Sequence, residues 1–331
     1  MAGGDVMSRY ARQMILPEVG DAGQRRLTGA HALVVGAGGL GAPVLQYLAG
    51  AGVGAITIVD PDVVDLGNLH RQVIFANADI GAPKAEAAAR FAAALNPDVD
   101  ARARREALTP ANAPALIAAA DVALDCADSF AASYTLSDAC FAAGTPLISA
   151  SALGLSGYAG GFCAGAPSLR AVFPDLPDRT ASCAEAGVLG PVVGVVGAAQ
   201  AQMALSLLLG AAPSPLGLVA RYDAATLRMT TFRFDDAPEP AGRPFAFIAP
   251  TDIAAGDFVV DLRGADEAPR PATPDALRAD VAAFGPDGPS PAAGQRAVFC
   301  CRSGLRAWRA AARLSPVWDG EIALVALGDP P

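Results

Sequence analysis

A glycine-rich turn between an apolar strand and a helix-length segment constrains the fold of this 331-residue chain most strongly. The turn, residues 36–41, reads GAGGLG and follows the apolar run 32–35, so that Gly36, Gly38 and Gly41 fit GxGxxG. A second apolar strand, 55–59, ends at Asp60, which lies 19 residues beyond Gly41. This order predicts a mononucleotide-binding βαβ unit. In such a unit the glycines let the backbone approach a phosphate at a helix N-terminus, and the acidic side chain binds ribose hydroxyls.

Strands and helices continue to alternate up to about residue 150. We expect helices over 83–95 and 131–143 and strands over 122–124 and 146–149. The pattern predicts a Rossmann-like α/β fold with a mainly parallel sheet and helices on both faces. We expect a helical arm before residue 31 and further strands within 154–163 and 218–234. The domain boundaries that follow are a nucleotide-binding domain over 1–234, a Pro-rich linker over 235–250 and a small α/β tail over 251–331.

Charge and composition exclude several classes of protein. The net charge of −9 and the pI of about 4.7 argue against nucleic-acid binding, which needs a basic surface. The N-terminus shows no signal-peptide pattern, so we expect a cytoplasmic protein. Segment 186–210 carries no charge, but it contains Pro191, Gln200, Gln202 and five glycines. We therefore expect a buried core helix there and no membrane span.

Several further motifs occur in a fixed order and identify a family. They are Arg9-Tyr10-x-Arg12-Gln13, GAGGLG, the strand ending at Asp60, NLHRQ at 68–72, GAPK at 81–84, Leu124-Asp125-Cys126-x-Asp128, and Ser182-Cys183-x-x-Ala186-Gly187-Val188. With them the chain resembles the MoeB/ThiF/HesA family, bacterial relatives of ubiquitin-activating enzymes, over about residues 9–234. The resemblance implies an ATP-dependent adenylyltransferase that uses ATP and Mg²⁺. It implies as substrate the C-terminal glycine carboxylate of a small ubiquitin-like sulfur-carrier protein of the MoaD/ThiS type. The resemblance further implies that the reaction releases pyrophosphate and serves sulfur transfer in molybdopterin, thiamine or related biosynthesis.

The resemblance also implies roles for individual residues. Arg71 and Lys84 would bind the triphosphate, Asp128 would hold Mg²⁺, and Asp60 would bind the ribose. Arg12 would reach the ATP of a partner subunit, which implies a homodimer. The other residues implied to bind the nucleotide are Gly36, Gly38, Gly39, Gly41, Asn68, Gln72 and Ser129. Ser129 departs from the family, which has Asn at that position.

Many family members carry two CxxC pairs that bind structural zinc, and this chain lacks both. Ser168 and Ala171 stand where the first pair belongs, and 236–242 contains no cysteine. Because thiolates make such sites bind zinc, we expect no zinc, with hydrophobic packing in its place.

Two of the six cysteines stand in a context that indicates thiol chemistry. Cys183 lies in the segment that crosses over the active site in the family. Cys301 opens the run 301–306, CRSGLR, which resembles the active loop of a rhodanese domain. Backbone N–H groups in such a loop, together with Arg302 and Arg306, favour an anionic sulfur. The tail is short for a rhodanese and lacks its usual Gly-His-Ile segment, so a catalytic and a purely structural tail both stay open.

Other functions remain as alternatives. The GxGxxG motif alone favours an NAD-dependent oxidoreductase, against which NLHRQ and GAPK argue. A non-catalytic carrier-binding protein is argued against by the retention of Arg12, Asp60, Arg71, Lys84 and Asp128. An activator of a peptide or of a tRNA substrate stays open.

Overall fold

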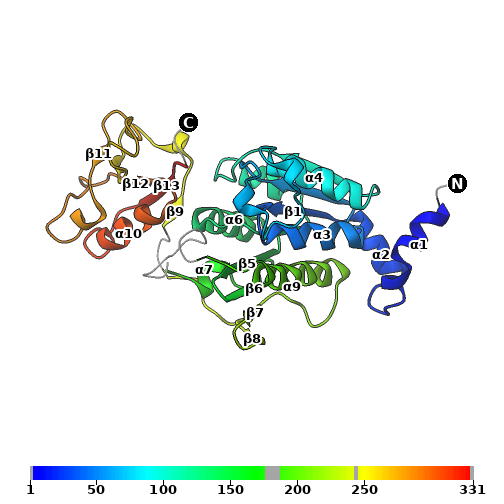
Figure 1. Cartoon of the computed structure of the whole chain (residues 1–331). Coiled ribbons are helices and arrows are strands. Elements are labelled where there is room, and N and C mark those ends of the chain that lie inside the picture. Colours follow the sequence, from blue (N-terminus) through cyan, green and yellow to red (C-terminus); the bar gives the residue numbers. More distant parts are fainter. Residues whose placement is uncertain (1–2, 176–186, 242–244, 329–331) are drawn as a thin grey trace.

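Two β-sheets organise the chain (Figure 1). The structure is a computed structural model, and it describes residues 3–175, 187–241 and 245–328. The larger sheet has eight strands in the order β3-β2-β1-β4-β5-β6-β7-β8. Neighbours from β3 to β5 run parallel, whereas β6, β7 and β8 are antiparallel additions. The strands are β1 (His31–Val35), β2 (Ala55–Val59), β3 (Asp100–Arg104), β4 (Val122–Asp125), β5 (Leu147–Leu153), β6 (Ser156–Phe162), β7 (Leu218–Asp223) and β8 (Arg228–Arg233).

Helices cover both faces of this sheet, because successive strand side chains point to opposite sides. In β1, Ala32 and Val34 lie in one core with α3, α4 and α9, while Leu33 and Val35 lie in another with α5, α6 and α7. This arrangement confirms the predicted α/β fold. The helices are α3 (Gly41–Ala51), α4 (Lys84–Leu95), α5 (Ala113–Ile117), α6 (Phe130–Ala143), α7 (Leu169–Val172) and α9 (Gly190–Leu209), and the arm consists of α1 (Gly3–Met14) and α2 (Gly20–Gly29).

Helix α9 is the apolar segment of the sequence. Within the described ranges it is the one helix long and apolar enough to cross a membrane. It packs against α3, β5 and β6, and Val196 and Ala204 are almost completely buried in the shared core. Gln200, which is fully buried, donates through Nε2 to the carbonyls of Asp125 at 2.7 Å and Ile148 at 2.9 Å. The polar residue thus ties α9 to the sheet, as a core helix requires.

The tail forms a second, five-stranded parallel sheet of order β11-β10-β12-β13-β9. Its edge strand β9 lies inside the expected linker 235–250, so part of that segment belongs to the tail's sheet. The sequence gives little sign of a strand only two residues long. The tail's elements are β9 (Ala246–Phe247), β10 (Phe258–Asp261), β11 (Leu277–Arg278), β12 (Ala297–Cys301), α10 (Leu305–Leu314) and β13 (Ile322–Ala326).

The tail packs against α6 of the larger unit (Figure 1). Ala131 and Tyr134 of α6 share a core with the tail residues Phe247 and Trp308, and the Tyr134 and Trp308 rings lie 5.0 Å apart. A methyl group added to Gly304 would lie 3.3 Å from the Cβ of Ala131, so the loop before α10 touches the first turn of α6. The tail therefore contacts the helix that begins directly after Asp128 and Ser129.

Candidate active site

The strand order reverses between β1 and β4, and this position defines a crevice at the carboxyl ends of the parallel strands. β2 and β3 lie on one side of β1, and β4 and β5 lie on the other. In open α/β sheets, ligands bind at such a switch point. The Gly-rich turn after β1 and the turn after β4 flank this crevice, which brings the predicted glycines and Asp128 to one edge of the sheet.

The Gly-rich turn requires glycine at two positions. Gly36 has φ +96°, and a Cβ there would lie 2.6 Å from the carbonyl oxygen of Cys126. A Cβ at Gly41, the first residue of α3, would lie 2.1 Å from the carbonyl oxygen of Gly36. The turn thus packs directly on the segment after β4 while its N–H groups precede a helix, which suits a phosphate.

Asp60 supports the Gly-rich turn. Its Oδ2 accepts the Ala37 N–H at 2.8 Å and its Oδ1 accepts the Asp62 N–H at 2.9 Å. Burial raises the pKa of this carboxyl, and the two N–H groups and the charge of Lys84 oppose the rise. The side chain is 5% exposed. The sequence predicted that Asp60 binds a ribose, but it did not show that the same side chain also holds the Gly-rich turn in place.

The segment 68–72 lies beside the turn. The Asn68 carbonyl accepts the N–H groups of Arg71 and Gln72, which begins a compact turn after the short helix Leu66–Asn68. A Cβ at Gly39 would lie 3.5 Å from the Cγ of Arg71, and one at Gly38 would lie 3.7 Å from Nε2 of Gln72. Arg71 is partly exposed, and its Nη1 donates to the Gly67 carbonyl at 3.2 Å.

Gln72 carries a buried oxygen without a partner. The residue is 3% exposed, and its Oε1 has no hydrogen-bond donor within the described structure. An unpaired buried acceptor is costly, so a donor from a ligand would remove that cost. Together with the glycine cradle, this orphaned oxygen fits a bound nucleotide.

Lys84 begins α4 and is 7% exposed. Its Nζ forms an ion pair with Oδ2 of Asp62 at 2.9 Å, and the Asp62 side chain is largely exposed. Asp62 is a residue whose role the sequence did not reveal, although it stands two positions after Asp60. The pair keeps the ammonium group in place beside the Gly-rich turn.

Asp128 is exposed at the end of the turn after β4, and Ser129 caps α6 without a capping hydrogen bond from its side chain. The Asp128 carboxylate is therefore free to coordinate the metal ion of a bound nucleotide at the open edge of the crevice. In the described part of the chain, no group of three or more His, Cys, Asp or Glu residues is arranged to hold a metal by itself. The absence of zinc stays a prediction.

Two predicted residues lie away from the crevice or outside the description. Arg12 is exposed in the last turn of α1, and its neighbour Gln13 donates to the Ala51 carbonyl at the far end of α3. Since α3 has 11 residues, that end lies about 16 Å from the Gly-rich turn. Arg12 is therefore not brought to the site of its own chain. Cys183 lies outside the described residues.

Cys301 ends β12 and is fully buried. Its Sγ accepts the N–H groups of Gly304 at 3.1 Å and Ala307 at 3.4 Å, at the N-terminus of α10. Arg306 approaches this sulfur but is held by Glu267, whose Oε2 lies 2.8 Å from Nη1. The loop is thus built to stabilise a sulfur anion. Burial raises the pKa of the neighbouring Cys300 thiol to about 12.

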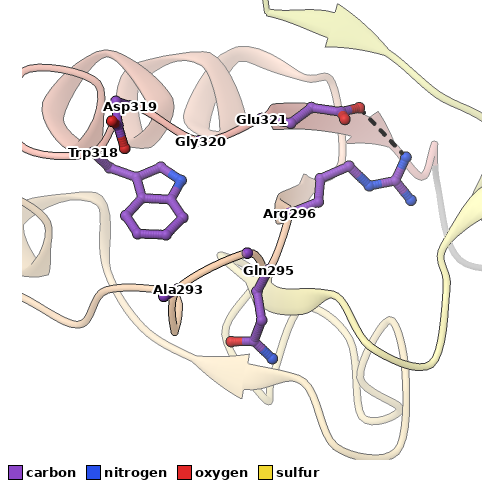
Figure 2. A pocket seen from close by; sticks show the side chains of 8 residues that line it. Ala293, Gln295, Arg296, Trp318, Asp319, Gly320 and Glu321 are labelled. Atoms are coloured by element: carbon purple, nitrogen blue, oxygen red, sulfur yellow. Dashed lines mark ion pairs between the residues drawn. The ribbon is translucent and has the colours of Figure 1, made fainter.

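A cavity of about 400 Å³ lies at the other end of β12 (Figure 2). Arg296 and Glu321 point toward one another there at 3.7 Å, and Arg296 is also paired with Asp257 at 2.6 Å. Because this cavity is at the amino ends of β12 and β13, it is separate from Cys301. Its lining residues are Ala293, Gly294, Gln295, Arg296, Trp318, Asp319, Gly320 and Glu321.

Comparison with known proteins identifies the larger unit. The sequence pattern of the ThiF family matches residues 10–242. The chain is 40% identical to the SAMP-activating enzyme E1 of Haloferax volcanii over 235 residues, which are 70% of this chain and 87% of that protein. It is 45% identical to the adenylyltransferase and sulfurtransferase MOCS3 of Sus scrofa over 228 residues, 66% of this chain but only 49% of that protein. The chain thus spans about half the length of MOCS3.

Solved structures share the fold of the larger unit. The structure of E. coli MccB with ATP has a TM-score of 0.62 at 20% identity, covering 70% of this chain and 73% of MccB. At this identity the likeness shows the fold alone. The match over 10–242 and the identity to the SAMP-activating enzyme confirm the predicted family, and the chain belongs to the ThiF family.

Proposed function

We propose that this protein catalyses ATP-dependent adenylation of the C-terminal carboxylate of a small ubiquitin-like sulfur-carrier protein. The observation that carries the proposal is the contact of the Gly-rich turn with the turn before Asp128, where a Cβ on Gly36 would lie 2.6 Å from the carbonyl of Cys126. The phosphate cradle and the candidate ligand of Mg²⁺ thereby share one crevice. The name of the SAMP-activating relative and the names of MOCS3 and UBA4 adenylyltransferases support this chemistry.

The residues around the crevice match what the reaction needs. The carrier's carboxylate oxygen attacks the α-phosphorus of ATP, the bond to the bridging oxygen breaks, and pyrophosphate leaves with its negative charge. Arg71 and Lys84 offset that charge, and Asp128 would hold the Mg²⁺ of MgATP, which would supply further charge neutralisation. The Lys84 ammonium is now paired with exposed Asp62, so it can exchange this partner for phosphate. Catalysis is then mostly positioning and charge neutralisation.

The partners follow from the same proposal. The carrier is of the MoaD/ThiS type and serves molybdopterin, thiamine or related biosynthesis. A homodimer forms in which Arg12 reaches the site of the partner. The described cysteines Cys126, Cys140, Cys163, Cys300 and Cys301 are all free thiols, which supports a reducing, cytoplasmic compartment.

Exchange of labelled pyrophosphate into ATP tests the function. Exchange should require both Mg²⁺ and a carrier with a free C-terminal glycine, and a carrier without its terminal Gly-Gly should give none. Exchange that a short peptide supports and no carrier supports would show an activator of peptides instead. Absence of exchange with a panel of MoaD/ThiS-type carriers would reject the proposal.

Calorimetry separates ATP from NAD. We expect MgATP to bind and NADH to give no measurable heat, since Arg71, Lys84 and Asp128 suit a triphosphate. Asp128→Ala should abolish exchange because the metal loses its protein ligand. NADH binding as tight as that of MgATP would favour the oxidoreductase.

A further inference from the structure

Asp125 is a buried carboxylate that the proposed reaction does not use. It is the last residue of β4, at the switch point of the sheet, and is 1% exposed. Its Oδ2 accepts the hydroxyl of Ser149 on β5 at 2.8 Å, and its Oδ1 accepts the N–H of Ala127 at 3.2 Å. Ser133 of α6 also hydrogen-bonds to it. These partners are neutral, so the folded protein bears part of the cost of burying a charge. Such a cost beside a ligand site indicates a functional role.

The carboxylate holds the turn that separates β4 from α6. The Ala127 N–H belongs to the middle of this turn, one residue before Asp128. The Cys126 N–H donates to the Val35 carbonyl at 2.8 Å, and the Asp125 carbonyl accepts Nε2 of Gln200 at 2.7 Å. The beginning of the turn is therefore tied to β1 and α9. Its middle is tied to β5 through the Asp125 and Ser149 side chains.

This geometry links Asp125 to the direction of Asp128. The Asp125 carbonyl and the Cys126 N–H, the two polar groups of one peptide, are both fixed. The turn can then change direction only by rotation of the backbone dihedral angles of Cys126 and Ala127. The hydrogen bond to the Ala127 N–H restricts that rotation and so sets where the next residue points. Asp128 is exposed and has no capping bond from Ser129 beside it to restrain the turn. The bond from the Ala127 N–H to Asp125 is therefore the side-chain restraint that lies next to Asp128.

We propose that Asp125 is a positioning residue of the nucleotide site, which holds the turn 126–129 so that Asp128 faces the Mg²⁺ of bound MgATP. This inference rests on the proposed function, because it concerns the same metal–nucleotide site. Asp125 does not touch the nucleotide and acts through Asp128. Groups behind a metal ligand commonly have a large effect on metal affinity, and their replacement costs roughly 10- to 100-fold.

Calorimetry of ATP with and without Mg²⁺ tests the proposal. In the wild type, Mg²⁺ should tighten ATP binding. Asp125→Asn and Ser149→Ala should each reduce this gain by about tenfold and leave the affinity for metal-free ATP within about twofold. A role in folding alone would weaken both forms of ATP binding equally. Ser149→Ala keeps the test usable if Asp125→Asn fails to fold.

The chain offers matched controls. Asp121 stands at the other end of β4, where its carboxylate accepts the N–H of His31 at 2.8 Å, so Asp121→Asn removes a similar bond far from the crevice. Ser151→Ala changes an exposed serine of the same strand, β5. In both controls, Mg²⁺ should increase the affinity for ATP as much as it does in the wild type. In an Asp128→Ala background, Asp125→Asn should cause no further loss, because its effect passes through Asp128.

The outcomes separate the two proposals. If Mg²⁺ tightens ATP binding to Asp125→Asn and Ser149→Ala as much as to the wild type, the positioning role alone is overturned. The same holds if Asp125→Asn still weakens MgATP binding by the full amount in the Asp128→Ala background. If Mg²⁺ does not tighten ATP binding to the wild type, the ATP-dependent function and this inference both fail. If the expected losses occur but no carrier supports pyrophosphate exchange, the inference stands and the choice of substrate is wrong.

Discussion

Ser168 and Glu239, which are 71 residues apart, are joined by two hydrogen bonds. The N–H and the hydroxyl of Ser168 donate to the two carboxylate oxygens of Glu239 at 2.7 and 2.6 Å. Ser168 stands where many family members have a zinc-binding cysteine, and Glu239 lies in the stretch where the second cysteine pair belongs. The expected hydrophobic packing is present, because Leu169, Val172 and Ala237 share one core. The charged hydrogen-bonded contact between Ser168 and Glu239 adds to it.

This contact should stabilise the protein without metal. Glu239→Ala removes both acceptors and leaves the buried Ser168 hydroxyl without its partner, so we expect the free energy of unfolding to fall by about 1–2 kcal/mol. Urea denaturation measures it. Asp236→Ala, at an exposed position nearby, is the control and should change it by less than about 0.5 kcal/mol. Metal analysis of the purified protein should find no stoichiometric zinc. One zinc per chain that resists dialysis would contradict this account.

Arg170 should hold the tail against α6. Its guanidinium forms a bidentate pair with Asp138 at 2.6 and 2.8 Å, donates to the Phe245 carbonyl and lies 4.7 Å from the Tyr134 ring and 5.6 Å from the Trp308 ring. Arg170→Ala leaves a partly exposed carboxylate and an unfilled space, so we expect a loss of about 2–3 kcal/mol and earlier protease cleavage between the two units.

A matched pair tests whether burial causes that loss. Arg233 forms an equally short bidentate contact with Asp235, but both side chains are about half exposed. Arg233→Ala should therefore lower the free energy of unfolding much less than Arg170→Ala does, because water screens an exposed ion pair. Equal losses in the free energy of unfolding for the two variants would show that burial is not the cause of the loss in Arg170→Ala.

The sequence predicted the parts of the fold that have apolar periodicity. The strands of the βαβ unit and helix α4 lie within one or two residues of their predicted bounds. Strand β3, Asp100–Arg104, escaped prediction because it is a polar edge strand with mostly exposed side chains. Helix α5, Ala113–Ile117, escaped because it has only five residues. Local pattern is a weak signal where a neighbouring strand or a short turn decides the structure.

Motifs predicted which residues would line the crevice, but not their partners. The Asp62–Lys84 pair joins residues 22 positions apart, and the Ser168–Glu239 contact joins residues 71 positions apart. Nothing in the local sequence fixes such pairs, because they depend on how strands and crossing segments meet. The packing of the tail on α6 is unpredictable from sequence for the same reason.

Asp125 should give stability an unusual dependence on pH. Burial raises its pKa in the folded protein from 3.8 to about 6, so the folded state binds this proton more tightly than the unfolded chain. The stability from this group is fully present below about pH 4 and is lost as the pH rises through about 6. Asp125→Asn removes that dependence. The free energy of unfolding of Asp125→Asn, minus that of the wild type, should therefore increase by up to about 3 kcal/mol from pH 4 to pH 7.

Urea denaturation at several pH values, without nucleotide or Mg²⁺, checks this sign. Asp121→Asn is the control on the same strand and should not reproduce the change. A difference between Asp125→Asn and wild type that stays constant from pH 4 to pH 7 would show that Asp125 does not titrate in this range.

Arg12 should act in the site of a partner subunit. Its place beside the far end of α3, about 16 Å from the Gly-rich turn, excludes it from the site of its own chain. Arg12→Ala and Lys84→Ala homodimers should both lose pyrophosphate exchange. Mixed subunits should regain part of it, since one site in each heterodimer is intact. Failure to regain activity after proven subunit exchange would refute the role in trans.

The last prediction concerns the thiols of the tail. If the tail transfers sulfur, the Cys301 thiolate attacks the outer sulfur of thiosulfate, the S–S bond breaks, and sulfite leaves with the electron pair. The resulting persulfide gives its outer sulfur to cyanide, which forms thiocyanate and restores the thiolate. The N–H groups of Gly304 and Ala307 stabilise the anion at each stage. Cys301→Ser should therefore abolish thiosulfate:cyanide sulfurtransferase activity and the formation of carrier thiocarboxylate from thiosulfate.

The neighbouring cysteine is the natural control, because it differs in environment and not in residue type. Burial raises the pKa of Cys300 to about 12, so it stays a neutral thiol and Cys300→Ser should keep sulfur transfer.

Adenylation needs only MgATP and a carboxylate, so Cys183→Ser and Cys301→Ser should both keep pyrophosphate exchange. Since Cys301 is fully buried, the attack requires the loop 301–304 to open. The tail would be structural, and another protein would supply the sulfur, if the wild type forms no thiocyanate. The same conclusion would follow if Cys301→Ser forms thiocyanate as fast as the wild type does.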